Sequence, residues 1–209
     1  MRIPEGPSPA ADDLRGRVIE RLRPTRTAAR ELLRLDLPPA AAAHFSRMSL
    51  RPAAVLVPIL EDSLEVLLTQ RSENLRTHAG QISLPGGSCD PSDRDAVDTA
   101  LREAEEEIGL LRADVEVVGL LDDYPTGTGF RVTPVVGLVS PAARPQADGI
   151  ETTGLLRVPL AHVLEPAHYR AGSFVREGIE LPFLEIVWGE HRIWGATAGI
   201  LHNLCDKLR

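Results

Sequence analysis

Apolar residues along the chain repeat with two different spacings, which predict a mixture of helices and short strands. Spacing typical of amphipathic helices covers 12–22, 26–35 and 95–108, the alanine run 40–43 predicts a further short helix, and another helix is expected over 196–208. Residues 1–10, which contain three prolines, are expected to form a mobile tail.

Short apolar runs bounded by turn residues predict the strands. The runs 53–60 and 64–70, with the polar turn 61–63 between them, predict a hairpin. The Ala/Pro-rich stretch 141–147 is expected to be a loop. Further strands are expected at 114–121, 131–139, 154–158, 173–176 and 182–188.

Helices and strands follow one another without strict alternation, which favours an α/β fold with a mixed sheet flanked by helices. A chain of 209 residues is most simply one compact domain with an extension. We therefore expect residues 1–50 to form an N-terminal tail and helical extension, and residues 51–209 to form the main domain.

Composition places the chain among globular proteins, since 43% of residues are hydrophobic and 25% are charged. The longest apolar run, 53–60, contains Pro58 and is too short to span a bilayer. No signal sequence opens the chain, so we expect a cytoplasmic protein without a membrane partner. Cys89 and Cys205 are expected to be free thiols.

The net charge of -7 argues against nucleic acid as a partner, because general nucleic-acid binding needs a basic surface. The first 60 residues carry ten arginines against six acids, which we interpret as a solvated helical face. Lys207 is the only lysine, so an arginine alone is weak evidence of function. An anionic substrate would still have to be held by local arginines.

The predicted helix 95–108 carries glutamates that break two local rules. Glu103, Glu106 and Glu107 stand at positions where like charges repel one another, and they lie near a C-terminus where the helix dipole disfavours negative charge. A divalent cation would reverse both penalties. The alternative is a solvated acidic helix end. The buried stripe of this helix is predicted to be Val97, Ala100, Leu101, Ala104 and Ile108, before a Gly109 cap.

These glutamates belong to a longer motif. Segment 87–93, Gly-Ser-Cys-Asp-Pro-Ser-Asp, and segment 102–110, Arg-Glu-Ala-Glu-Glu-Glu-Ile-Gly-Leu, together resemble the Nudix box, G-x5-E-x7-R-E-U-x-E-E-x-G-U with U apolar. The second half matches throughout. In the first half, Asp93 replaces a glutamate and one extra residue precedes Arg102. The resemblance implies a loop-helix-loop that holds metal against a nucleoside-diphosphate substrate, within an α/β/α sandwich.

The segment upstream of the box is similar to the signature of the coenzyme A diphosphatase subfamily, L-L-T-x-R-S-x3-R-x3-G-x3-F-P-G-G. It begins at Leu67 and ends at Gly87, and only Leu84, in place of Phe, departs from it. The longer box and its Asp93 are also similar to that subfamily. The likeness extends over about residues 50–205 and leaves the first fifty residues unexplained.

The resemblance implies roles for the acidic and basic residues. Glu103 and Glu107 are the strongest ligand candidates for Mg2+ or Mn2+, and Glu106 shares their cluster. Arg102 would orient these carboxylates; the alternative is an ordinary surface ion pair. Glu151 falls where the subfamily has a glutamate and is a candidate general base, although its neighbours fit poorly and a solvated loop acid is the alternative.

Substrate contacts are predicted upstream of the box. Arg71 and Arg76 would grip phosphate oxygens, with pairing to nearby acids as the alternative. His78 and Gln81 belong to the same loop and would line the site. The glycine pair at 86–87 would allow a tight turn into the box loop. We interpret Cys89 as a spectator thiol and Trp194 as a packing residue.

The sequence thus predicts a metal-dependent hydrolase that cleaves coenzyme A, and its acylated forms, to adenosine 3',5'-bisphosphate and 4'-phosphopantetheine. A Nudix hydrolase of ADP-ribose or a dinucleotide is one alternative. The other is a Nudix module that binds a nucleotide without turnover, which the intact glutamates disfavour. Whether the chain forms a homodimer stays open.

Overall fold

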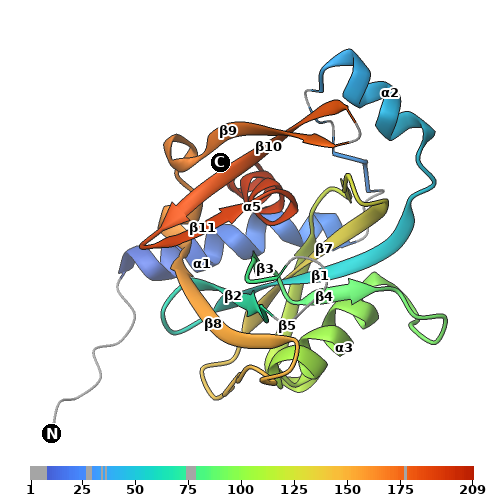
Figure 1. Ribbon diagram of the computed structural model, residues 1–209. Helices are drawn as coiled ribbons and strands as arrows, with labels where there is room; N and C mark the ends of the chain where they lie inside the picture. Colours follow the sequence, from blue (N-terminus) through green and yellow to red (C-terminus); the bar gives the residue numbers. More distant parts are fainter. Residues whose placement is uncertain (1–8, 27–29, 34, 36, 74–78, 177) are drawn as a thin grey trace, which may run out of the picture.

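We describe the fold from a computed structural model of the chain, which has helices on both sides of a central sheet (Figure 1). Backbone structure is described for residues 9–26, 30–33, 35, 37–73, 79–176 and 178–209. The predicted mobile tail at 1–10 therefore lies mostly outside the described residues, and its last two residues begin a helix.

The central sheet is mixed, as the sequence predicts. Strand β1 (Arg51–Leu60) runs parallel to β7 (Phe130–Val139) along its whole length and meets β2 (Glu65–Arg71) as the antiparallel hairpin expected at 61–63. The remaining strands of this sheet are β3 (Ile82–Ser83), β4 (Gly86–Ser88), β5 (Val115–Leu120), β6 (Tyr124–Pro125) and β8 (Thr152–Pro159).

Alternation along β1 creates two hydrophobic cores, one on each face of the sheet. Val57 and Ile59 enter the core that also contains residues of α1 (Pro9–Leu22) and α5 (Ala196–Leu208). Leu56 and Leu60 enter the other core, which is closed by α3 (Ala96–Ile108). Successive strand residues point to opposite faces, so a strand covered on both sides is apolar throughout. The sheet is therefore the middle layer of an α/β/α arrangement.

A second sheet of three strands lies over α5, with the order β11 (His191–Trp194), β10 (Ile179–Trp188) and β9 (Arg170–Arg176) (Figure 1). Trp194 packs among Phe174 and Phe183 in this sheet, in agreement with the packing role expected for it. Short helices complete the fold: α2 (Pro39–Arg47), α4 (Leu160–Val163), and the 3-10 turns η1 (Arg23–Arg26), η2 (Arg112–Asp114) and η3 (Pro166–His168).

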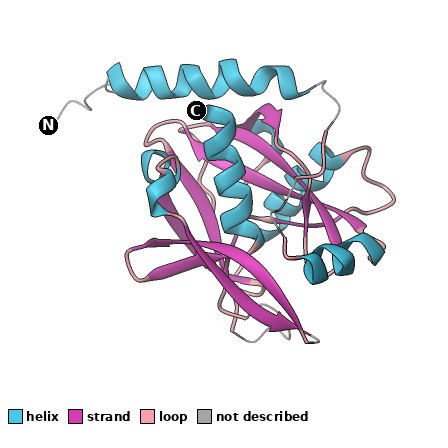
Figure 2. Cartoon of the chain, turned by 90° about the horizontal axis from the view of Figure 1, so that it is seen from above, coloured by secondary structure: helices cyan, strands magenta, loops and turns pink. Residues whose placement is uncertain are grey.

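The N-terminal helix is packed into the main body. Val18 and Leu22 of α1 are fully buried in the same core as α5. Arg21 donates to the carbonyl of the last residue, Arg209, at 3.3 Å, and Figure 2 shows the C-terminal end of α5 next to α1. Thr25 of η1 accepts a hydrogen bond from the Leu120 amide at 2.8 Å. These contacts join the first described residues to the sheet edge at β5.

Most predicted elements are confirmed, but the helix expected at 26–35 is wrong in its described part. Residues 30–33 form no helix, and Leu32 forms a parallel bridge with Asp123. The Leu33 amide donates to the Asp123 carbonyl, and the Asp123 amide donates to the Glu31 carbonyl. Tertiary hydrogen bonding here overrides the local helical spacing. The prediction at 40–43 is confirmed as the longer helix α2, whereas the short strands β3, β4, β6 and β11 and the helix α4 were not predicted.

No helix among the described residues is long and apolar enough to cross a membrane. Both cysteines are free, Cys205 buried and Cys89 half-buried, as expected.

Candidate active site

Helix α3 has a capping residue at each end, and its apolar stripe packs against the sheet, which fixes the direction of its acidic face. The Asp95 side chain caps the first turn by accepting from the Asp98 amide at 2.9 Å. At the other end Gly109 has a φ of 61°, a left-handed conformation that suits glycine, so the predicted cap is confirmed. Ala100, Leu101, Ala104 and Ile108 are buried as predicted, and Val97 is half-buried.

The two glycines before the box let α3 approach the sheet closely. Gly86 and Gly87 lie in β4, which pairs with β1. A β-carbon on Gly87 would lie 2.6 Å from the carboxylate of Glu103, and one on Gly86, whose φ is 153°, would collide with the backbone of β1. Any larger residue at either position would displace β4 or the glutamate. The pair therefore brings the box strand directly against the acidic face.

Glu107 is the most buried acid of this face, with 7% of its surface exposed. Its pKa is raised to about 7, mainly by burial and to a smaller extent by the charges of Glu103 and Glu151; the Gly86 amide, donating at 3.2 Å, and Arg71 oppose this shift. Burial also raises the pKa of Glu103. Two neighbouring carboxylates are thus held where their ionised forms are poorly compensated.

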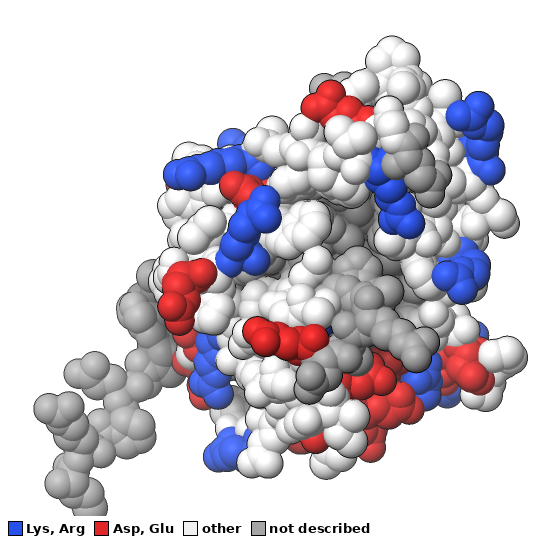
Figure 3. Space-filling model, viewed as in Figure 1, with Lys and Arg blue, Asp and Glu red and all other residues white. Residues whose placement is uncertain are grey.

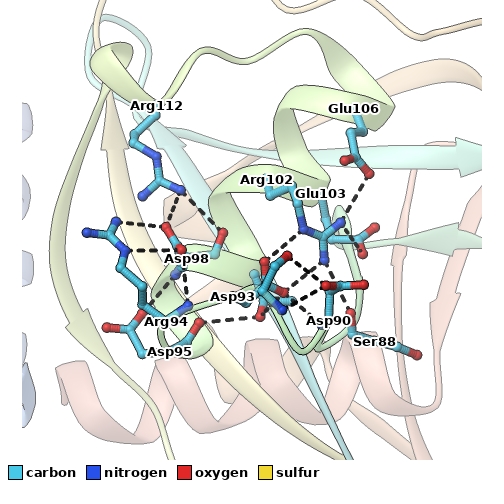
Figure 4. Close-up of polar contacts among 12 residues, drawn as sticks. Ser88, Asp90, Asp93, Arg94, Asp95, Asp98, Arg102, Glu103, Glu106 and Arg112 are labelled. Atoms are coloured by element: carbon cyan, nitrogen blue, oxygen red, sulfur yellow. Dashed lines mark hydrogen bonds and ion pairs between the residues drawn. The ribbon is translucent and has the colours of Figure 1, made fainter.

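Arg102 connects the loop before α3 to the glutamates of the helix (Figure 4). Its guanidinium donates to both carboxylate oxygens of Asp93 at 3.0 Å and lies 2.9 Å from Glu103 and 3.1 Å from Glu106. The hydrogen bonds between the two side chains lower the pKa of Asp93 and raise the pKa of Arg102, so both stay charged. Arg102 thus contacts acids of both the loop and the helix.

The position of Glu106 differs from that of the other two glutamates. Its side chain is 60% exposed and reaches Arg102, whereas Glu103 and Glu107 lie against β4. Across the described residues, no three His, Cys, Asp or Glu side chains are close enough together to hold a metal ion by themselves. Glu103 and Glu107 provide two hard oxygen ligands facing one strand, which fits a divalent cation that completes its shell with water or substrate oxygens.

Arg71 at the end of β2 joins this face from the opposite side. Its Nη1 lies 3.8 Å from Oε1 of Glu107, and its buried Nε has no hydrogen-bond partner within the described part of the chain. The separation exceeds a hydrogen bond, so the guanidinium retains donors for another oxygen. The Arg71 amide donates to the Gln81 carbonyl at 2.9 Å, which holds the Gln81 backbone beside it.

Glu151 reaches the same neighbourhood from the long β7–β8 connection. The amide of Ser72, next to Arg71, donates to the Glu151 carbonyl at 2.8 Å. The Glu151 side chain is exposed, yet its charge raises the pKa of Glu107. The structure therefore brings Arg71, Glu103, Glu107 and Glu151 together. Arg76 and His78 lie outside the described residues.

The sequence analysis did not assign a role to Asp93, although its departure from the box marked it. Thr99 donates to Asp93 at 2.8 Å in addition to Arg102, which makes Asp93 the anchor of the box loop. A depression of about 490 Å³ lies on the other side of Arg102 and is lined by Asp93, Asp98, Arg102, Arg112 and neighbours, without Glu103 or Glu107. Figure 3 shows acidic side chains gathered on the part of the surface formed by α3.

Comparison with known proteins agrees with this arrangement. The model of the NUDIX domain matches residues 50–175. The proteins described as uncharacterized Nudix hydrolase NudL from Yersinia pestis and Yersinia pseudotuberculosis are 40% identical to this chain over 168 residues, which is 79% of this chain and 83% of theirs.

Solved structures with a related fold are more distant. The MutT protein of Methanosarcina mazei is 26% identical, with a TM-score of 0.45 over 56% of this chain and 83% of its own. The NUDIX domain of Shewanella oneidensis NrtR, solved with ADP-ribose, is 22% identical, with a TM-score of 0.42 over 62% of this chain and 82% of its own.

The sandwich, the acidic helix and the extended match to the domain define a hydrolase of phosphoanhydride bonds. The chain belongs to the Nudix hydrolase family. Enzymes of this family generally use divalent metal ions such as Mg2+ or Mn2+.

Proposed function

We propose that the protein is a coenzyme A diphosphatase that hydrolyses coenzyme A, or an acylated form of it, to adenosine 3',5'-bisphosphate and 4'-phosphopantetheine. The observation that carries the proposal is the meeting of two motifs. Arg71 belongs to the upstream signature and Glu107 to the box, and their side chains lie 3.8 Å apart. The signature that separates this subfamily from other Nudix proteins would thus contribute a residue, Arg71, to the same site as the glutamates of α3.

Glu103 and Glu107 would hold the metal, with Glu106 contacting a second ion or its water. When bound, Mg2+ or Mn2+ would acidify water and neutralise charge that builds on the phosphoryl oxygens. Arg102, locked by Asp93, would keep the Glu103 carboxylate aimed at β4. This division leaves Arg102 out of direct substrate contact.

Recognition of the diphosphate falls to Arg71, with Arg76, His78 and Gln81 along the same loop. A guanidinium whose Nε is buried without a partner and whose Nη1 lies 3.8 Å from a carboxylate can bind a phosphate oxygen without first breaking a hydrogen bond. The glycine pair at 86–87 would contribute by letting the Glu103 carboxylate lie directly against β4. Glu151 would accept a proton from the attacking water, because it approaches Glu107 from a separate element. A cytoplasmic location and a homodimer remain predictions.

The test is a substrate panel with product identification by mass. Coenzyme A, dephospho-coenzyme A, ADP-ribose and a dinucleoside polyphosphate are incubated with the protein, with Mg2+ or Mn2+ and with a chelator. We expect coenzyme A to yield adenosine bisphosphate and phosphopantetheine only with metal. Hydrolysis of ADP-ribose or the dinucleotide with coenzyme A untouched would contradict the proposed substrate, while the assignment as a Nudix hydrolase would stand. Binding without turnover of any substrate would contradict the enzymatic proposal.

A further inference from the structure

The connection between β7 and β8 brings Glu151 back to α3, and its geometry is set by one side chain, that of Asp148. Oδ1 of Asp148 accepts from the amides of Ile150 at 3.1 Å and Thr152 at 2.8 Å, and Oδ2 accepts from the Glu151 amide at 3.3 Å. Three consecutive amides therefore converge on one carboxylate. Residue 149 is a glycine with a φ of 75°, a conformation that lets the chain turn around that carboxylate.

The same turn is hydrogen-bonded to the C-terminal end of α3. The Asp148 amide donates to the Glu107 carbonyl at 3.1 Å, and the Gln146 amide donates to the Ile108 carbonyl at 2.8 Å. These carbonyls belong to the last turn of α3, whose carbonyls lack partners within the helix. The first residue of the turn, Asp148, is therefore hydrogen-bonded directly to the backbone of Glu107.

On its other side the turn is attached to β2. The Glu151 carbonyl accepts from the Ser72 amide, and Thr152, the first residue of β8, pairs with Arg71. Glu151 is thus fixed between the backbone of Glu107 and the backbone next to Arg71. Partial burial opposes the ionisation of Asp148, but the three amides outweigh it and lower its pKa, so the carboxylate is charged at neutral pH.

From these contacts we infer that Asp148 is a positioning residue for the hydrolysis, which holds Glu151 at a set place relative to Glu107 through the backbone amides of 150–152. The inference rests on the proposed function, because it assigns to Glu151 a role in proton transfer. Without the carboxylate, the three amides would turn to water and the exposed Glu151 would no longer be held in one position. A general base displaced by about 1 Å can cost about a hundredfold in rate.

The test compares Asp148→Ala, Asp148→Asn, Glu151→Gln and the double variant Asp148→Ala/Glu151→Gln. Asparagine keeps one oxygen and so retains the acceptor for Ile150 and Thr152, while it loses the charge and the acceptor for the Glu151 amide. Glu165→Ala is the matched control, since Glu165 accepts from the Ala167 amide at 3.2 Å in a loop outside the candidate site. Each variant is measured for kcat and KM and, without metal, for hydrogen exchange of the 150–152 amides.

We expect Asp148→Ala to speed exchange at 150–152 and to lower kcat about 10- to 100-fold with KM changed less than about threefold. Asp148→Asn should fall between it and the wild type, and the control should match the wild type. In the Glu151→Gln background, Asp148→Ala should cause no further loss, because the group it positions is already gone.

Three results would overturn the inference: unchanged exchange in Asp148→Ala, an equal loss of kcat with and without Glu151, or a Glu151→Gln variant with wild-type kcat. The kinetic measurements use whichever diphosphate the wild type hydrolyses, so failure of coenzyme A as substrate contradicts only the proposed specificity. A wild type that hydrolyses none of them contradicts the proposed function and, with it, the catalytic part of this inference, while the exchange data still show whether Asp148 orders the turn.

Discussion

Two buried carboxylates of this protein, Asp123 and Glu107, have opposite surroundings. Asp123 is 1% exposed and accepts from Arg30 at 3.1 Å, Arg131 at 2.6 Å and Thr133 at 2.8 Å. Glu107 is 7% exposed and has one amide donor at 3.2 Å and Arg71 at 3.8 Å, with two other acids close enough to raise its pKa.

The difference in pairing distinguishes a carboxylate that stabilises the fold, Asp123, from one proposed to act in the site, Glu107. A buried charge is costly unless it is paired and hydrogen-bonded, and Asp123 meets that condition with groups of the chain alone. Glu107 does not, although a fold that only needed stability could place an apolar residue there. We propose that this weakly paired carboxylate is one half of a site whose other half is a cation. Each prediction below changes one side of this comparison.

The largest effect is expected on stability from Asp123→Ala. The substitution leaves Arg30, Arg131 and Thr133 without their shared partner, and it removes the side-chain contact between the N-terminal segment and Asp123. Breaking a buried pair costs about 3 to 5 kcal/mol, so the melting temperature should fall by about 10 °C or more. Thermal unfolding with a chelator measures it, with the exposed Asp62→Ala as control. Equal melting temperatures for the two variants would show that the cluster adds nothing.

Next in size is the loss of activity in Glu107→Gln. Removing a ligand charge should raise the barrier by several kcal/mol and lower kcat by about a hundredfold or more, while the fold is retained. The control is Glu105→Gln, an exposed acid on the same helix. Steady-state kinetics on the substrate identified by the panel provides the comparison. Near-normal turnover by Glu107→Gln would make it an ordinary helix acid.

A smaller effect is expected from Arg71→Ala, which should raise KM about ten- to hundredfold with little change in kcat. Because Arg71 lies beside Glu107, it should contact the diphosphate and not the 3'-phosphate. The loss should therefore be equal for coenzyme A and dephospho-coenzyme A. A penalty seen only with coenzyme A would move the contact to the 3'-phosphate, and no penalty for either would leave Arg71 as a partner of Glu107 alone.

The smallest effect is the pH dependence of stability without metal. The pKa of Glu107 is raised from 4.5 to about 7, so the folded state holds its proton more tightly than the unfolded state. The stability associated with this proton is complete below about pH 4.5 and is lost as pH rises to about 7. Glu107→Gln should therefore gain on the order of 1 to 3 kcal/mol over the wild type at pH 8 compared with pH 4.5. Chemical unfolding with a chelator would show a constant difference if Glu107 were not perturbed.

The sequence was sufficient for elements whose residues carry a strong local pattern. The continuous apolar run 53–60 predicted a strand, and the apolar stripe and glycine cap of α3 predicted that helix, because each pattern matches the way the element packs in the fold. The helix prediction failed at 30–33 because the partner of this segment, Asp123, is distant in sequence and determines its conformation by hydrogen bonding. Local spacing cannot contain that information.

The same distinction applies to the candidate site. The motif named Glu103, Glu107 and Arg71 without structure, since their spacing carries the resemblance. It could not show that Glu106 is exposed while Glu107 is buried, or that Asp148 folds the loop under Glu151, because those facts depend on how β4 and the β7–β8 connection meet α3.

The most direct test of the account is Mn2+ binding to the isolated protein, measured by calorimetry for the wild type, Glu107→Gln and Glu105→Gln. If Glu107 is only weakly paired within the chain because it serves a cation, the wild type and Glu105→Gln should bind Mn2+ alike, and Glu107→Gln should bind it at least about tenfold more weakly. Equal affinity for all three proteins would contradict the account.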